Sequence, residues 1–329
     1  MLESLKIGLL SPFQSIADSG SRVFWLFLLA NVVIAVVFLA LRFRQLQKES
    51  IANQEFSFGR YFVGFFSAAH WRTKSSLVDV SYWLTNSVIK YTALVPVVFS
   101  YATGTLWVDD HLRAWFVSPG WQVAPGFLAL LYTLVFFIID DLSRFLLHRA
   151  LHLSPMLWRF HKVHHSATNL TPITLYRVHP VEMMLYFFRA LLVYVVITGV
   201  FLFLFSGKLT GVTLLGSNAC IVIFNLLGAN LRHSHIPLGF GFFEKWFISP
   251  LQHQVHHSSE PEHFDKNFGS VLAIWDRFFN SWYSSQNISK TKALSFGLGE
   301  NSPLLTAESD FISRPQANDF SLQNAYKSE

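Results

Sequence analysis

Long apolar segments separated by short polar ones constrain this chain more than any other feature. The first of them, residues 23–41, contains no charged side chain. An α-helix rises about 1.5 Å per residue, so this segment is long enough to cross the hydrocarbon core of a bilayer. A secretory signal peptide would carry its basic residues before the apolar run, whereas here Arg42 and Arg44 follow it. The segment therefore predicts an uncleaved membrane-spanning helix.

Four further apolar segments follow, and the composition agrees with them. They are residues 80–108, 127–139, 183–205 and 212–228, the last two being predicted as a helical hairpin. Lys90 and Pro96 interrupt the first of the four, which predicts a kinked helix or two pieces. Hydrophobic residues make up 52% of the chain and charged residues only 14%, whereas soluble domains carry about 25% charged residues. The predicted fold is therefore all-α: a polytopic membrane helical bundle.

Charge and cysteine content exclude several classes of function. The formal net charge is +5, but the basic residues lie beside the apolar segments and form no separate patch, so no nucleic-acid partner is expected. Cys220 is the single cysteine. It excludes a disulfide framework, a cysteine-based zinc site and an iron–sulfur cluster.

The distribution of Lys and Arg predicts the orientation in the membrane. Basic residues concentrate in residues 42–74 and 141–182, whereas the loops 109–125 and 206–210 hold one each. Because basic loops stay inside, the histidine-rich part is predicted to form a cytoplasmic cap. The lack of a C-terminal dilysine signal favours a bacterial inner membrane over the endoplasmic reticulum.

Three regions are predicted along the chain. They are an N-terminal span with a basic loop (1–75), a membrane domain (76–283) and a polar cytoplasmic tail (284–329).

Histidines carry most of the functional information, because only His70 and His111 of the 14 lie outside residues 148–263. Eight form one HxxxH and two HxxHH blocks: His148 and His152; His161, His164 and His165; His253, His256 and His257. Residues i, i+3 and i+4 share a helix face, so each block offers its imidazoles to one point. Neutral imidazole is a strong ligand for borderline metals. Clustering these rings without a metal would cost desolvation free energy, so the spacing predicts a metal site.

The number of imidazoles favours two metal ions, since one ion takes about four to six ligands. Two redox metals suit oxygen activation and two zinc ions suit hydrolysis, and imidazole ligation alone does not separate iron from zinc or copper. Outside the blocks, His233 and His179 are predicted as further ligands. His235 lies two residues beyond His233 and is disfavoured, and His263 is expected on the solvated surface.

Three carboxylates lie among the blocks: Asp141, Glu182 and Asp276. Metal-bound imidazoles usually donate their second N–H to a carboxylate or carbonyl, which is the role predicted for these residues. The alternative is a salt bridge to a neighbouring arginine.

The order of the blocks around a helical hairpin, together with four short motifs, resembles the fatty acid hydroxylase / sterol desaturase superfamily of integral-membrane di-iron oxygenases. The resemblance covers residues 127–283. The segment with His233 and His235 is similar to the sterol desaturase and alkylglycerol monooxygenase branches. The motifs are Asp141 followed by His148-Arg149, His179-Pro180-x-Glu182, Asn267-Phe268-Gly269 and Trp275-Asp276-Arg277-Phe278-Phe279.

The resemblance implies two iron ions, O₂ as co-substrate, ligand roles for the eight block histidines, and hydroxylation or desaturation of a sterol, fatty acyl or alkylglycerol ether chain. The chain has no CxxC pair, dinucleotide fingerprint or obvious fused haem domain, so a separate cytoplasmic electron-transfer protein is expected. Two other functions are alternatives to this oxidoreductase. A zinc-dependent membrane hydrolase usually carries HExxH, which is absent. A non-enzymatic metal-binding membrane protein would place ionisable residues inside its spans.

Overall fold

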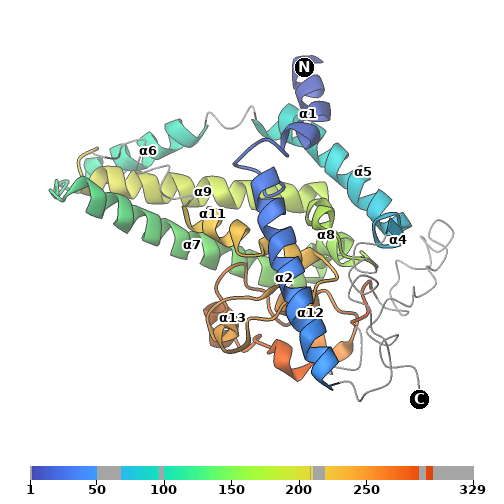
Figure 1. The fold of residues 1–329 in the computed structure, drawn as a ribbon. Helices are drawn as coiled ribbons and strands as arrows, with labels where there is room; N and C mark the ends of the chain where they lie inside the picture. Colours follow the sequence, from blue (N-terminus) through green and yellow to red (C-terminus); the bar gives the residue numbers. More distant parts are fainter. Residues whose placement is uncertain are drawn as a thin grey trace.

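The computed structural model describes residues 2–49, 68–95, 100–207, 209, 219–288 and 294–298. These residues form helices without a strand, and two isolated β-bridges, which confirms the predicted all-α class (Figure 1). The α-helices are α1 (Leu2–Gln14), α2 (Trp25–Glu49), α4 (Ala68–Trp71), α5 (Lys74–Ile89), α6 (Ser100–Trp115), α7 (Pro125–Leu153), α8 (Pro155–His165), α9 (Pro180–Leu204), α11 (Ala219–Leu226), α12 (Pro250–His256) and α13 (Ile274–Phe278). Short turns of helix connect them: η1 (Lys90–Leu94), η3 (Pro172–Tyr176), η4 (Ala229–His233), η5 (Gly241–Lys245), η6 (Pro261–His263) and η7 (Ser285–Asn287).

Among the described residues, three helices are long and apolar enough to span a bilayer: Trp25–Arg44 within α2, α7 and α9. In the described residues, the segment 80–108 is divided between α5, the π-helical turn η1 and α6. Pro96, the expected site of interruption, lies outside the described residues. Of the predicted second hairpin helix, only the part from residue 219 onward is described, and α11 ends at Leu226.

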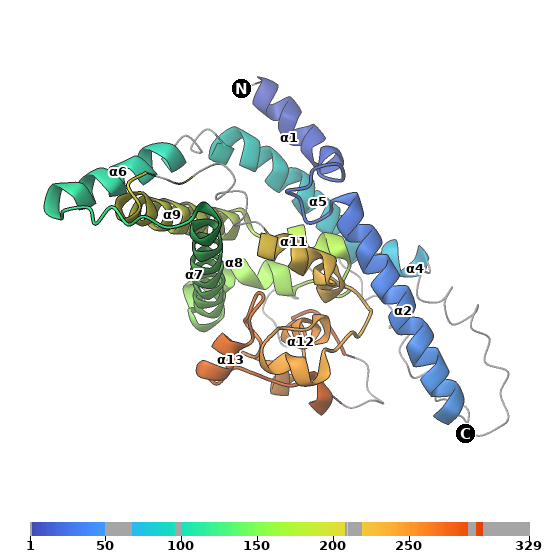
Figure 2. The same ribbon diagram turned by 60° about the vertical axis from the view of Figure 1, so that its left-hand side comes forward.

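The helices α7 and α9 lie side by side, and α6 packs along α9 (Figures 1 and 2). Gly199 allows the close approach of α6, because a Cβ there would lie 2.6 Å from Cβ of Val108. The side chains between α7 and α9 form an apolar core, in which Tyr132 and Thr198 share a hydrogen bond of 2.9 Å. Helix α2 runs past α11 and packs on η4 and the chain beyond it (Figures 1 and 2).

Helix starts position the histidine blocks. Ser154 ends α7 and caps α8, where Pro155 occupies the first position, so the chain turns sharply between the first two blocks. Ser249 caps α12 in a capping box with Gln252, and Pro250 again follows the cap. These local signals set where α8 and α12 begin, and histidines of both helices contact His148 of α7.

Candidate metal centre

The histidines that the sequence singles out come together in two groups. The first histidine group contains His148, His152, His161, His165 and His256, and the second contains His164, His233, His253 and His257. Within each group the candidate ligand nitrogens lie within 4.8 Å of one another. The two groups adjoin, since the rings of His165 and His257 stack at 4.5 Å.

Each HxxHH block contributes to both groups, which differs from the expectation that a block aims at one point. On α8, the i and i+4 residues His161 and His165 join the first group, whereas His164 at i+3 joins the second. On α12 the assignment is reversed, with His253 and His257 in the second group and His256 in the first. The HxxxH pair of α7 completes the first group, and the residue on η4, His233, completes the second.

Hydrogen bonds fix which nitrogen of the first-group rings is free. Nδ1 of His148 lies 2.8 Å from the carbonyl of Phe268, and Nδ1 of His256 lies 2.8 Å from that of Lys266. A carbonyl only accepts, so Nδ1 carries the hydrogen and Nε2 keeps a bare lone pair. Nε2 of His148 lies 3.1 Å from Nε2 of His161, whose Nδ1 lies 2.8 Å from Glu182. Two acceptor nitrogens at this distance repel each other unless a cation binds both of them.

The second group also contains nitrogens without a hydrogen that lie close to one another. Nδ1 of His164 donates to the carbonyl of Arg177 at 3.2 Å, so Nε2 of His164 is bare. Nε2 of His233 lies 3.3 Å from that atom, 3.1 Å from Nε2 of His253 and 3.2 Å from Nε2 of His257. One imidazole nitrogen cannot share a hydrogen with three others.

These spacings are those of ligands around a metal ion. At metal–nitrogen distances of about 2.0–2.1 Å, neighbouring ligand nitrogens lie about 3 Å apart. Nε2 of His152 and of His256 is buried with no hydrogen-bond partner in the described part of the chain. The donor set therefore fits one metal ion in each group.

Burial keeps the rings in the form that binds metal. It lowers the pKa of His161 and of His164 to about 3. The remaining five ligand candidates outside the spans have pKa values well below the usual range, through burial and then the neighbouring imidazoles: His165, His233, His253, His256 and His257. All seven are therefore neutral at neutral pH, as a metal ligand must be.

Of the three predicted carboxylates, Glu182 is the one that meets an imidazole, through the contact with His161. Asp141 instead accepts hydrogen bonds from the backbone N–H groups of Val271 and Leu272 and from the indole of Trp275. Among the described residues, neither Asp141 nor Asp276 forms an ion pair with an arginine. The alternative prediction of a salt bridge is therefore also wrong for these two residues.

Asp276 accepts from the N–H groups of Phe268 and Gly269 at 2.8 and 2.7 Å, and from the hydroxyl of Ser281. Asp141 and Asp276 thus hold one loop, residues 266–276, from two sides. Two carbonyls of this loop, those of residues 266 and 268, receive the Nδ1–H groups of first-group histidines. Both carboxylates therefore act on the site through the loop and not by direct contact.

The remaining histidines lie outside both groups. His179, predicted as a ligand, caps α9, and its Nδ1 accepts from the N–H of Val181 at 3.1 Å. Nδ1 of His235 lies 2.9 Å from Nε2 of His70, which in turn lies 3.2 Å from the carbonyl of Leu170. The expectation that His263 is solvated is wrong, because its side chain is 3% exposed.

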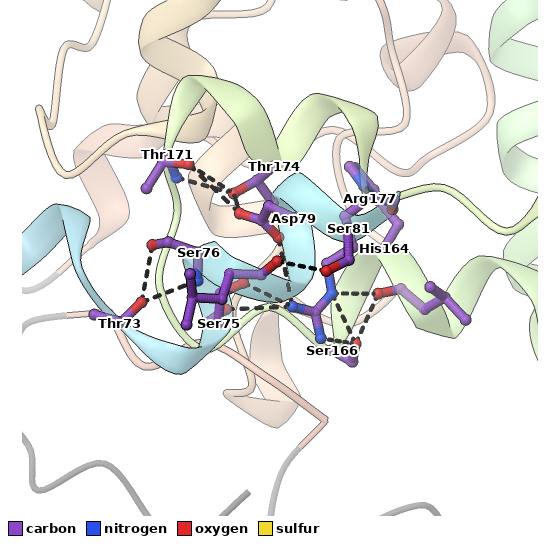
Figure 3. Close-up of polar contacts among 12 residues, drawn as sticks. Thr73, Ser75, Ser76, Asp79, Ser81, His164, Ser166, Thr171, Thr174 and Arg177 are labelled. Atoms are coloured by element: carbon purple, nitrogen blue, oxygen red, sulfur yellow. Dashed lines mark hydrogen bonds and ion pairs between the residues drawn. The ribbon is translucent and has the colours of Figure 1, made fainter. Parts of the chain in front are cut away.

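A buried ion pair that the sequence analysis misses supports the second group (Figure 3). Asp79 of α5 is fully buried and pairs with Arg177 at 3.4 Å, and Thr174 donates a 2.6 Å hydrogen bond to it. The guanidinium of Arg177 also donates to the carbonyl of Val163 and the hydroxyl of Ser166. The carbonyl of Arg177 orients His164. Two sequence signals could have indicated this ion pair. They are a carboxylate on the packed face of α5 and an arginine just before the His-Pro motif.

Replacing Asp79 with Asn is expected to destabilise the protein by about 3–5 kcal/mol, because it leaves the guanidinium of Arg177 buried without its counter-charge. The metal content of the second group should fall with it, since Arg177 holds His164. Thermal unfolding in detergent and metal analysis measure both effects. Ser81→Ala, on the exposed face of the same helix, is the matched control. Equal melting temperatures and metal contents for the two variants would contradict this role.

Comparisons with known proteins agree with this geometry. The fatty acid hydroxylase family model matches residues 133–281. Ornithine lipid hydroxylase OlsE from Rhizobium tropici is 26% identical over 160 residues, which cover 47% of this chain and 42% of that protein. Alkylglycerol monooxygenase from Danio rerio is 28% identical over 147 residues, 44% of this chain and 29% of that protein.

The alkylglycerol monooxygenase of Caenorhabditis elegans is 26% identical over 148 residues, 45% of this chain and 26% of its own length. The chain thus spans less than half the length of these curated relatives. No solved structure matches it. The region matched by the family model contains every residue of both histidine groups. The family model and these relatives together support the fatty acid hydroxylase superfamily for residues 133–281.

Proposed function

We propose that this protein is a membrane-bound oxygenase that hydroxylates or desaturates a lipid at a pair of iron ions. One observation carries the proposal: two adjoining groups of neutral, buried imidazoles lie at the end of an apolar helix long enough to span a bilayer. Two metals with imidazole ligands suit oxygen activation. The names of the relatives, a lipid hydroxylase and two monooxygenases, support hydroxylation in particular.

The residues of the chain would hold and orient the metals. The first histidine group would bind one iron and the second group the other. Bound iron would supply O₂ activation and the attack on an unactivated C–H bond. Glu182 accepts the N–H of His161 and so fixes that ring in the tautomer with Nε2 free. The carbonyls of Phe268 and Lys266 do the same for His148 and His256, and the carbonyl of Arg177 does so for His164.

The proposed substrate is a membrane lipid with a long apolar chain. The relatives are named for ornithine lipid and alkylglycerol, which share such chains. Helix α7 contains both a candidate span and the first two ligands, His148 and His152, so a lipid chain can reach the site from the bilayer. Burial of most of the imidazoles excludes bulk water from the reacting atoms.

Hydroxylation needs two external electrons for each O₂: RH + O₂ + 2e⁻ + 2H⁺ gives ROH + H₂O. We propose that a separate cytoplasmic electron-transfer protein supplies them, because the sequence contains no CxxC pair or dinucleotide fingerprint. The basic loops predict that the histidine groups face the cytoplasm. Exposed Arg159, on the helix that contributes to both groups, would favour an acidic carrier.

Isotope labelling tests the proposed reaction. The protein, reconstituted in bilayers of extracted membrane lipid with a chemical or enzymatic reductant, is incubated under ¹⁸O₂ in ordinary water. Hydroxylation predicts lipid that carries one ¹⁸O atom, and desaturation predicts unlabelled lipid two hydrogens lighter together with O₂ consumption. A His233→Ala variant should give neither product. A lipid product labelled only from H₂¹⁸O in the reverse experiment would indicate a hydrolase and contradict the oxygenase.

A further inference from the structure

An exposed aromatic surface lies on the histidine-bearing part of the chain, outside the three candidate spans. It is formed by η5 with the residues that follow it, and by α13. Phe242 and Phe243 are each 61% exposed and Phe278 is 78% exposed. The members of this aromatic surface are Phe242, Phe243, Trp246, Phe247 and Phe278. A contiguous exposed apolar patch of this kind marks an interaction surface.

Contacts between η5 and α13 join the two parts of the aromatic surface. The ring of Phe242 lies 4.8 Å from that of Trp246 and 6.0 Å from that of Phe243. The N–H of Ala273 donates to the carbonyl of Trp246 at 2.8 Å, which fixes the chain after η5 against the start of α13. The rings therefore share one supported surface and are not independent loop tips.

The charges around the aromatic surface are positive. Lys245 and Arg277 are exposed, and the ammonium of Lys245 lies 5.0 Å from the ring centre of Phe242. The acidic residues of the same two helices, Glu244 and Asp276, are fully buried and accept internal hydrogen bonds. The surface thus presents aromatic rings and cations to its surroundings without an acidic side chain from η5 or α13.

The aromatic surface continues from a candidate membrane span. Phe279, next to Phe278, packs at 5.2 Å against Phe145 of α7, and the guanidinium of Arg149 lies 5.4 Å from its ring centre. Figures 1 and 2 both place α13 beside α7. Arg149 lies in the last turns of α7, where charged side chains replace the apolar run. This is the level at which a spanning helix leaves the hydrocarbon core.

We propose that the aromatic surface is a second membrane contact, which lies in the headgroup region on the side where α7 emerges. Aromatic rings with adjacent Lys and Arg are the side chains that bind this region, the rings at the acyl boundary and the cations at anionic headgroups. The contact holds the histidine-bearing part against the bilayer, so that a lipid chain reaches it without crossing water. The inference rests on exposure, charge and continuity with α7, and it does not depend on bound metal.

Depth-dependent fluorescence quenching tests this contact. Cys220 is the sole cysteine, so Cys220→Ser provides a cysteine-free background. Phe243→Cys or Phe278→Cys is introduced into it and labelled with an environment-sensitive fluorophore, in the full chain reconstituted in vesicles of phosphatidylcholine and phosphatidylglycerol. Glu262→Cys, at a side chain on η6 that is 72% exposed and belongs to neither η5 nor α13, is the matched control.

We expect labels at 243 and 278 to be quenched several-fold more strongly by nitroxide-bearing lipid than by aqueous iodide, and the label at 262 to show the reverse. Adding Lys245→Glu and Arg277→Glu should shift the 243 label toward iodide. Iodide quenching at 243 and 278 equal to that at 262 would overturn the proposal. Protection from both quenchers would also overturn it, since a protein, either a partner or a second copy, would then cover the surface.

Discussion

Replacing His233 with alanine is expected to remove the metal of the second histidine group and to lower lipid hydroxylation by more than about 100-fold. Loss of a residue that merely orients a ligand costs about 10–100-fold in metal affinity or activity, and His233 is itself a candidate ligand. Its Nε2 faces three other imidazole nitrogens within 3.3 Å, so no other ring can substitute for it. Metal analysis of purified protein and the ¹⁸O₂ assay measure the two effects.

His235→Ala is the matched control, because this ring lies two residues away and pairs with His70 outside both groups. It should retain the parent metal content. A His233→Ala protein that keeps two metals per chain, or an equal loss in both variants, would contradict the assignment of His233.

Asp276→Ala is expected to destabilise the protein by about 3–5 kcal/mol, a large share of a typical folding free energy of about 5–15 kcal/mol. The substitution leaves the buried N–H groups of Phe268 and Gly269 without their acceptor. Phe268 then no longer holds its carbonyl toward His148, so the metal content of the first group should fall as well. Thermal unfolding in detergent, with and without added Fe²⁺, measures the loss.

Asp276→Asn is the comparison variant. Its amide oxygen can replace one carboxylate oxygen, but its NH₂ group would face the other N–H, so an intermediate loss is expected. An Asp276→Ala protein that melts at the parent temperature would show that the loop does not depend on this carboxylate.

Sequence periodicity was sufficient to identify eight of the nine residues that gather in the two groups, because i, i+3 and i+4 spacing is a local property of a helix. The ninth, His233, lies outside the periodic blocks. Their division between the groups was not predictable in this way. It depends on how α8 and α12 face each other, and residues such as His165 and His257 stack from opposite helices. His179 was assigned by its motif, but a histidine directly before Pro180 is also an N-cap signal, and that is the role it has in the structure.

Long-range pairings account for most of the other differences. Asp79 and Arg177 are 98 residues apart, and no local pattern joins them. Asp141 and Asp276 lie near the blocks as expected, but they accept hydrogen bonds from backbone N–H groups of the loop and not from imidazoles. Gly269 is the one sequence feature that reflects this arrangement, because a Cβ at this position would lie 2.7 Å from a carboxylate oxygen of Asp276. The helices were predictable from hydropathy, whereas the path of α2 depends on its packing against η4 and α11.

Metal analysis of the detergent-purified parent protein is the most direct test of the proposed pair of iron ions. Iron and zinc are counted per chain, in a preparation shown to be folded by its cooperative thermal transition. The two histidine groups predict about two irons per chain, one for each group. One metal or none in well-folded protein would contradict a dinuclear centre, and two zinc ions without O₂ consumption after exchange to iron would contradict the oxygenase.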